Sequence, residues 1–135
     1  MNLAYRIGWW LLGVFYLFAG INHFRILDFY MPMMPRSLPA PLQLVELSGV
    51  FEFGLGAAAL ALGTQDARLR RWIAWAVIAL LVAVFPANLK IAFENIPLGG
   101  AKEGAGALNW VRLPFQGLFI AWAWLYTRRI GDERA

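Results

Sequence analysis

The chain has 135 residues, of which 61% are hydrophobic and only 15% are charged, whereas soluble domains carry about 25% charged residues; this composition excludes a small water-facing globule. The absence of cysteine excludes disulfides, thiolate metal sites and iron–sulfur clusters built by this chain. The formal net charge of +4 does not indicate nucleic acid, because the basic residues flank long apolar runs where membrane topology explains them better.

Four apolar stretches follow one another along the chain, and we predict that each forms a transmembrane helix. They cover residues 7–24, 42–63, 72–93 and 108–127. Each is close to the ~20 residues that cross ~30 Å of hydrocarbon, and none alternates like a strand of a membrane barrel. The first ends in Asn22-His23-Phe24 rather than in a small-residue cleavage site, so we interpret it as a retained helix. The sequence predicts an all-α membrane protein, a single four-helix transmembrane domain over residues 1–135.

A segment rich in proline and methionine joins the first two predicted helices. It covers residues 25–41 and contains four prolines, which prevent a long helix. Because several of its other side chains are apolar, we expect it to lie in the membrane interface or to fold over the bundle.

The basic residues also predict an orientation in the bilayer. With four spans, the side that holds both termini carries more lysine and arginine than the opposite side, and positive flanks resist translocation. We therefore predict that both termini are cytoplasmic.

The two halves of the chain resemble each other weakly. The stretch that begins Asn22-His23 resembles the one that begins at Asn88, and Ser48-Gly-Val-Phe-Glu52 resembles Arg112-Leu-Pro-Phe-Gln116. Two helices per unit would make the repeats parallel. Two parallel helix-pair repeats are one interpretation, and four unrelated helices are the other.

Polar side chains gather in the halves of the predicted helices that lie far from the termini. We predict that one ligand-binding pocket contains Asn22, His23, Glu46, Ser48, Glu52, Asn88, Arg112 and Gln116. A polar group in hydrocarbon is costly unless it is paired, so such residues are functional candidates. Residues four apart share a helix face, which places Ser48 beside Glu52 and Arg112 beside Gln116.

Two interpretations of Glu52 and Arg112 stay open. A guanidinium binds a carboxylate through two hydrogen bonds in low dielectric, so we expect these two side chains to pair if their helices face each other. The pair would then belong either to the pocket or to a structural clamp between helices. Glu46 lies nearer the interface, where Arg25, Lys90 or water would pair with it.

We predict no metal site. His23 is better explained as a capping or interfacial residue than as a ligand. Met31, Met33 and Met34 resemble thioether clusters that bind Cu(I), yet a soft interfacial loop explains them better. Haem would need a second axial ligand. Copper and haem are therefore disfavoured, and the cofactor stays open.

Five short motifs resemble the DoxX-like family of small four-helix membrane proteins, in order over residues 5–127. They are FAGINHF at 18–24, MP…LP at 34–39, SG…E…G at 48–56, FPAN at 85–88 and RLPFQ at 112–116. The resemblance implies a four-helix bundle in the bacterial inner membrane. It also implies a link to a thiosulfate:quinone oxidoreductase subunit and other redox systems, while distant relatives act in membrane-protein assembly.

Two functions follow from the pocket and the resemblance. The first is an accessory or quinone-interacting subunit of a redox system, with electrons supplied by a membrane or periplasmic partner protein. A quinone head is small and planar, and polar groups between aromatic walls suit it. The second is a non-enzymatic assembly factor or a binder of a hydrophobic small molecule. The lipid bilayer is a partner in both, and whether the chain is an enzyme stays open.

Overall fold

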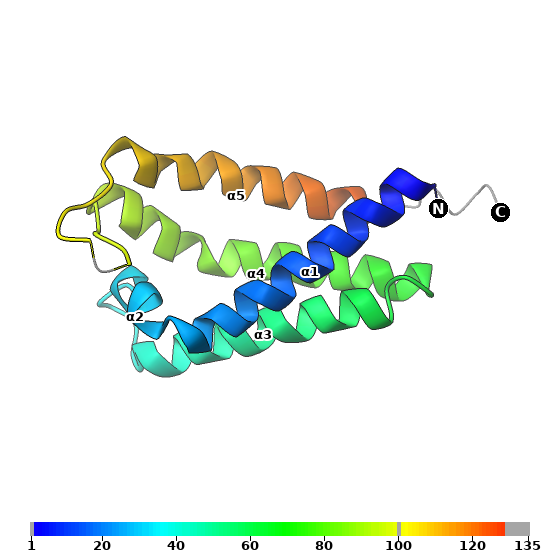
Figure 1. Cartoon of the computed structure of the whole chain (residues 1–135), viewed down its shortest axis with the longest axis horizontal. Coiled ribbons are helices and arrows are strands. Elements are labelled where there is room, and N and C mark those ends of the chain that lie inside the picture. Colours follow the sequence, from blue (N-terminus) through cyan, green and yellow to red (C-terminus); the bar gives the residue numbers. More distant parts are fainter. Residues whose placement is uncertain (1, 100, 129–135) are drawn as a thin grey trace.

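The computed structural model describes residues 2–99 and 101–128. In that part of the chain every regular element is a helix: α1 (Leu3–Arg25), α2 (Leu27–Tyr30), the 3₁₀ turn η1 (Met31–Met33), α3 (Pro41–Ala61), α4 (Ala67–Phe93) and α5 (Ala107–Leu125). The long helices lie side by side and run alternately in opposite directions, and α2 lies at the end remote from the N-terminus (Figure 1). The predicted all-α fold is confirmed over these residues.

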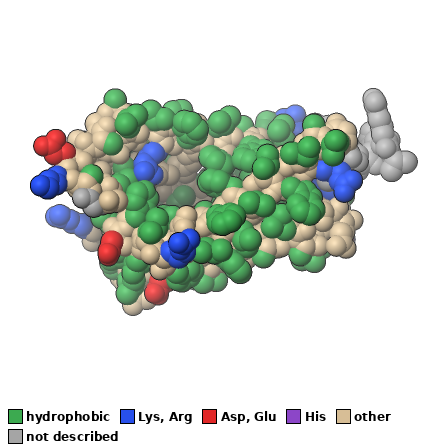
Figure 2. Space-filling model, in the orientation of Figure 1, with side chains coloured by type: hydrophobic (Ala, Val, Ile, Leu, Met, Phe, Trp, Pro, Cys, Tyr) green, Lys and Arg blue, Asp and Glu red, His purple; other side chains and the backbone are tan. Residues whose placement is uncertain are grey.

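Three helices are long and apolar enough to cross a membrane, namely α1, α3 and α4. Figure 2 shows hydrophobic side chains over most of the visible face, with charged side chains mainly towards its two ends. These features indicate a membrane protein. The helix α5 has 19 residues but is not among the three, so a fourth span stays a prediction.

Side-chain caps explain why two helices begin earlier than predicted. Asn2 Oδ1 accepts a hydrogen bond from the backbone of Tyr5 at 2.8 Å, so α1 begins before the apolar stretch. Asp66 accepts from Arg68 N at 2.7 Å and from Leu69 N at 3.1 Å, so α4 includes the arginines that precede its apolar run. Both caps satisfy amides that the first turn of a helix leaves unpaired.

The proline-rich connection packs onto the end of the bundle. Lys90 Nζ donates to Pro32 O at 3.0 Å and to Met34 O at 2.6 Å, which fixes η1 against α4. Met33 is buried. Of the two expected arrangements, the structure shows the one in which the segment folds over the bundle, and it adds the short helix α2.

The helices α1 and α3 meet backbone to backbone. A Cβ atom at Gly20 would clash with Phe53 N, and one at Gly56 would clash with Leu17 N. Small residues permit such close approach and drive helix association in lipid, where the hydrophobic effect does not act between helices. The two glycines therefore set the distance between these helices.

The packed core lies at the end of the bundle that holds the termini. Trp9 and Leu12 from α1 meet Ala59 from α3, residues of α4 such as Val77, and Ala123 near the end of α5. Trp9 Nε1 donates to Ala59 O at 2.8 Å.

An arginine at the start of α4 is buried at this end of the bundle. Arg70 is only 6% exposed. Its Nη1 donates to Gly63 O at 3.2 Å. Arg70 therefore holds the turn between α3 and α4 in place.

Candidate ligand-binding cavity

A cavity of about 340 Å³ lies in the half of the bundle that carries α2. All four long helices contribute to its walls, and α2 and η1 add to them near the end of the bundle. The surface is hollowed between α1 and α5 in this half (Figure 2). The volume lies within the ~300–1,000 Å³ of sites that hold small molecules.

The cavity brings together six of the eight residues predicted for the pocket. They are His23, Ser48, Glu52, Asn88, Arg112 and Gln116. These six come from four different helices, so the fold collects side chains that lie far apart in the sequence.

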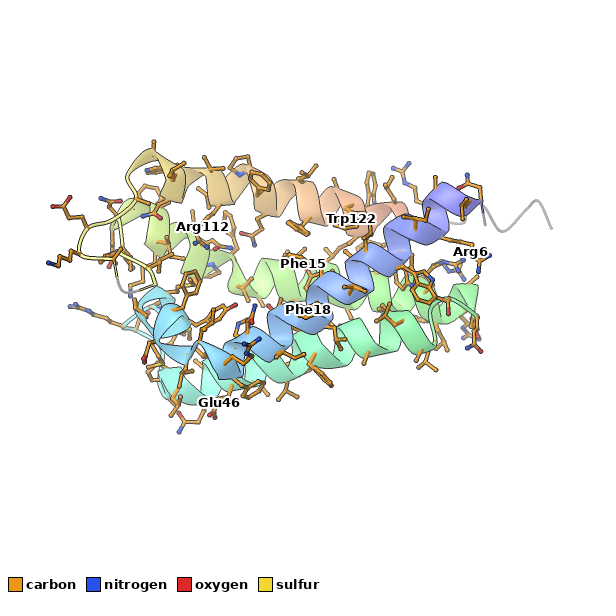
Figure 3. All side chains as sticks on the ribbon, viewed as in Figure 1. Arg6, Phe15, Phe18, Glu46, Arg112 and Trp122 are labelled. Atoms are coloured by element: carbon orange, nitrogen blue, oxygen red, sulfur yellow. The ribbon has the colours of Figure 1, made fainter. Side chains whose placement is uncertain are left out.

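Asn22 and Glu46 lie outside the cavity walls, which corrects their assignment. Asn22 is adjacent to His23, and neighbouring residues do not share a helix face. Glu46 precedes Glu52 by six positions, which at 3.6 residues per turn turns it away from that face. Glu46 is exposed, and Figure 3 shows it at the outer edge of α3, remote from Arg112.

His23 contacts the Glu52 carboxylate. Its Nδ1 lies 3.2 Å from Glu52 Oε2 and 2.9 Å from Ala19 O. Because Ala19 O only accepts hydrogen bonds, Nδ1 carries the hydrogen that lies between these two oxygens. The ring of His23 also stacks on Tyr30, with 3.9 Å between the ring centroids. The imidazole is thus fixed in orientation from two sides.

The predicted pair between Glu52 and Arg112 is wrong. The Arg112 guanidinium lies over the Phe29 ring, 5.9 Å from its centroid, and Figure 3 shows Arg112 directed from α5 towards the side of α1 and α2. Glu52 is occupied by His23 instead. Arg112 therefore has hydrogen-bond donors to offer to the cavity.

Tyr30 lies near the charges of both Glu52 and Arg112. Burial and the charge of Glu52 raise the pKa of Tyr30 above its ordinary value of 10.0, and the positive charge of Arg112 opposes this shift. The phenol consequently stays neutral at physiological pH and can act as a donor at the cavity wall.

Two amide side chains join α4 to α5 beside the cavity. Asn88 Nδ2 donates to Gln116 Oε1 at 2.8 Å, and Gln116 Nε2 donates to Leu81 O. Gln116 is only 5% exposed. This chain of hydrogen bonds uses both ends of the Gln116 amide, so Gln116 acts mainly to position Asn88.

Aromatic side chains form the side wall that faces outward. Phe15 from α1 stacks on Phe119 from α5 with a centroid separation of 4.6 Å. Phe15 and Phe115 line the cavity and are also about half exposed. The cavity therefore has an aromatic rim on the flank of the bundle, between α1 and α5.

Sequence reasoning missed two tyrosines in the cavity wall. Tyr16 lies two helical turns before His23, and this spacing of seven residues was the signal that could have revealed it. Tyr30 ends α2, a helix of four residues that is too short for a helical period to reveal it. The buried Oη of Tyr16 has no hydrogen-bond partner, and Glu52 Oε2 makes no well-aligned hydrogen bond. Buried polar atoms are nearly always paired, so the Tyr16 hydroxyl marks a place where a ligand could bind, and Glu52 Oε2, which has only the contact with His23, can accept a further hydrogen bond.

Comparison with known proteins identifies a family. No curated protein and no solved structure matches the chain, and its resemblance to the DoxX-like family stays a prediction. A family model matches residues 12–127. The chain therefore belongs to that family, which is described as a domain of unknown function, DUF8561.

Proposed function

We propose that the chain is a four-span, DoxX-like protein of the bacterial inner membrane, whose cavity binds the ring of a quinone. It would serve as an accessory or quinone-interacting subunit of a membrane redox system. The observation that carries this proposal is a cavity of about 340 Å³ with an aromatic rim on its flank and the buried, unpaired Tyr16 hydroxyl inside.

Packing supports α5 as the fourth span. The helix α5 lies along α4 (Figure 1), and Gln116 bonds with Asn88 inside the bundle. Four spans place both termini on one side, which the surplus of basic residues there makes cytoplasmic. The cavity then opens in the outer half of the membrane.

The polar atoms of the cavity suit a ring with oxygens at opposite edges. The Arg112 guanidinium and the Tyr16 hydroxyl are donors for a carbonyl oxygen. Glu52 Oε2 is an acceptor for a ring hydroxyl, as the reduced form of a quinone would present. Phe15 and Phe119 offer aromatic faces against which a planar ring stacks.

A lateral mouth suits a ligand with a lipid-soluble tail. The rim residues Phe15 and Phe115 are exposed on the flank of the bundle, so a tail would leave the cavity among acyl chains rather than in water. The chain has no cysteine and hence no thiol redox chemistry, so we propose that a partner protein supplies the electrons. The pair of His23 and Glu52 is placed to accept or return the accompanying protons.

Lipid extraction tests this proposal. The protein is purified in mild detergent, and bound molecules are extracted and identified by mass spectrometry. We expect close to one quinone per chain, and at least a fivefold loss in the Arg112→Gln variant. Arg25→Gln is the matched control, because Arg25 is exposed and does not line the cavity.

A different result would favour the second function. Phospholipid without quinone, together with a stoichiometric membrane protein in the purified sample, would contradict quinone binding. It would support an assembly factor whose cavity receives a partner or another hydrophobic molecule.

A further inference from the structure

A second, largely apolar hollow of about 800 Å³ runs along the flank between α3 and α4. On α3 its wall consists of larger apolar side chains, among them Leu44, Leu47, Phe51 and Leu55. On α4 the wall contains Ala76, Ala79, Ala83 and Ala87. The α4 wall also contains Leu80, Val84 and Pro86, and the groove lies between this alanine-rich wall and the larger side chains of α3.

The groove occupies one half of the membrane thickness. From Leu44 to Leu55, α3 rises by about 16 Å at ~1.5 Å per residue, which is close to half of the ~30 Å hydrocarbon core. Towards the short turn that joins the two helices, Ala59 and Ile73 belong to the packed core. The groove is therefore closed at the middle of the bundle and continues towards the end that carries η1.

Positive charge lies at the end of the groove near η1. Two further hollows adjoin it there and share Pro35 with it, and both contain Arg36, Lys90 and Glu94 in their walls. Arg36 is exposed. Lys90 uses two of its three hydrogens on backbone carbonyls, which keeps its charge in place and leaves one donor. With one carboxylate against two cations, this end of the groove is positive.

We propose that the groove between α3 and α4 holds one acyl chain of an anionic phospholipid, whose phosphate binds Arg36 and Lys90. The length of the groove favours this occupant, because an acyl chain extends through the thickness of one leaflet. A partner helix would need a groove that crosses the whole bilayer. The adjoining cations favour a lipid with net negative charge over a zwitterionic one. The groove opens on a different flank from the cavity of the quinone proposal, although the two hollows share five wall residues, Met34, Ser48, Leu80, Val84 and Ala87.

Binding of defined lipids to the full-length protein tests the proposal. Delipidated protein in detergent is titrated with dioleoylphosphatidylglycerol or with dioleoylphosphatidylcholine, and the complexes are counted by native mass spectrometry. We expect a first phosphatidylglycerol to bind at least fivefold more tightly than phosphatidylcholine. Arg36→Gln should abolish this preference, whereas Arg25→Gln, a control for charge at an exposed position, should leave it intact.

Filling the groove tests the site of the acyl chain. Ala83→Phe introduces a ring into the groove and should lower the affinity for both lipids by fivefold or more. Val82→Phe is the control, because Val82 is 59% exposed and lies outside the groove. Ala79→Leu provides a smaller filling if thermal unfolding shows that Ala83→Phe does not fold.

Three outcomes would overturn the proposal. Equal affinities of the native chain for the two lipids would show that Arg36 and Lys90 do not bind the lipid phosphate. Equal effects of Ala83→Phe and Val82→Phe on lipid affinity would show that the acyl chain does not lie in the groove. Displacement of the lipid by millimolar glycerol 3-phosphate would show that a free phosphate, rather than a lipid, is the ligand.

Discussion

The helices α1 and α3 meet through glycine backbones, whereas α4 and α5 are joined by amide side chains. In the first pair, Gly20 and Gly56 allow contacts that no larger residue would permit. In the second, Asn88 Nδ2 donates to Gln116 Oε1, and Gln116 Nε2 donates to Leu81 O. Close packing and interhelical hydrogen bonds are the two means by which helices associate in lipid.

The difference bears on where the cavity lies. A glycine contact leaves no space between helices, so the interface of α1 and α3 is closed. Amide side chains hold α4 and α5 together while their polar groups remain at the edge of the cavity, as Asn88 does. The pair joined by side chains therefore supplies both structural bonds and polar atoms for a ligand.

The largest expected effect comes from filling the glycine contact. In Gly56→Leu the new Cβ would meet Leu17 N and Gly13 O, which are backbone atoms that cannot move aside. We expect a loss of about 3 kcal/mol or more in the free energy of unfolding, measured by thermal unfolding in detergent. Gly54→Leu is the control, because a Cβ at Gly54 meets nothing within 4 Å. Equal melting temperatures for the two variants would refute the close contact.

A smaller loss is expected from the amide pair. Gln116→Leu leaves Asn88 Nδ2 without its partner, and we expect a loss of about 1–2 kcal/mol. Replacing Asn88 with leucine as well should recover part of that loss, because no buried donor remains unpaired. A double-mutant cycle measures this coupling, and strictly additive losses would show that the two amides act independently.

Neutralising Glu52 should lower the free energy of unfolding by less than the loss of the amide pair does. Glu52→Gln removes the carboxylate that contacts His23 but leaves the hydrogen bond from Nδ1 to Ala19 O, so we expect a loss of about 1 kcal/mol in the free energy of unfolding. The same substitution in a His23→Gln background should have no further effect. If Glu52→Gln lowered the free energy of unfolding by the same amount in that background, the stabilising partner of Glu52 would be a residue other than His23.

The smallest effect on global stability is expected at Lys90. In Lys90→Met the carbonyls of Pro32 and Met34 lose their donor, which should loosen η1 locally and change the melting temperature little. Hydrogen exchange in residues 31–38 should accelerate at least tenfold. Unchanged exchange would show that packing of Met33 alone holds the segment.

Helical periodicity explains which predictions could be made from the sequence. The lengths of the apolar stretches predicted the long helices, and a spacing of four residues placed Ser48 and Glu52 in one wall. The same geometry, applied more strictly, would have excluded Asn22 and Glu46. The partner of Glu52 could not be predicted, because His23 and Arg112 lie on different helices and only their packing decides which one reaches the carboxylate. Tyr30 depends on how an irregular, proline-containing segment folds back, which no period describes.

A final consequence concerns two tyrosines at the end of the bundle that holds the packed core. Tyr5 Oη donates to Leu125 O at 3.0 Å, and Tyr126 Oη donates to Tyr5 O at 3.1 Å. The beginning of α1 and the end of α5 are thus adjacent at this end of the bundle. A circularly permuted chain, cut in the turn between α3 and α4 and joined across these tyrosines, would keep every interhelical contact while exchanging the order of the two helix pairs.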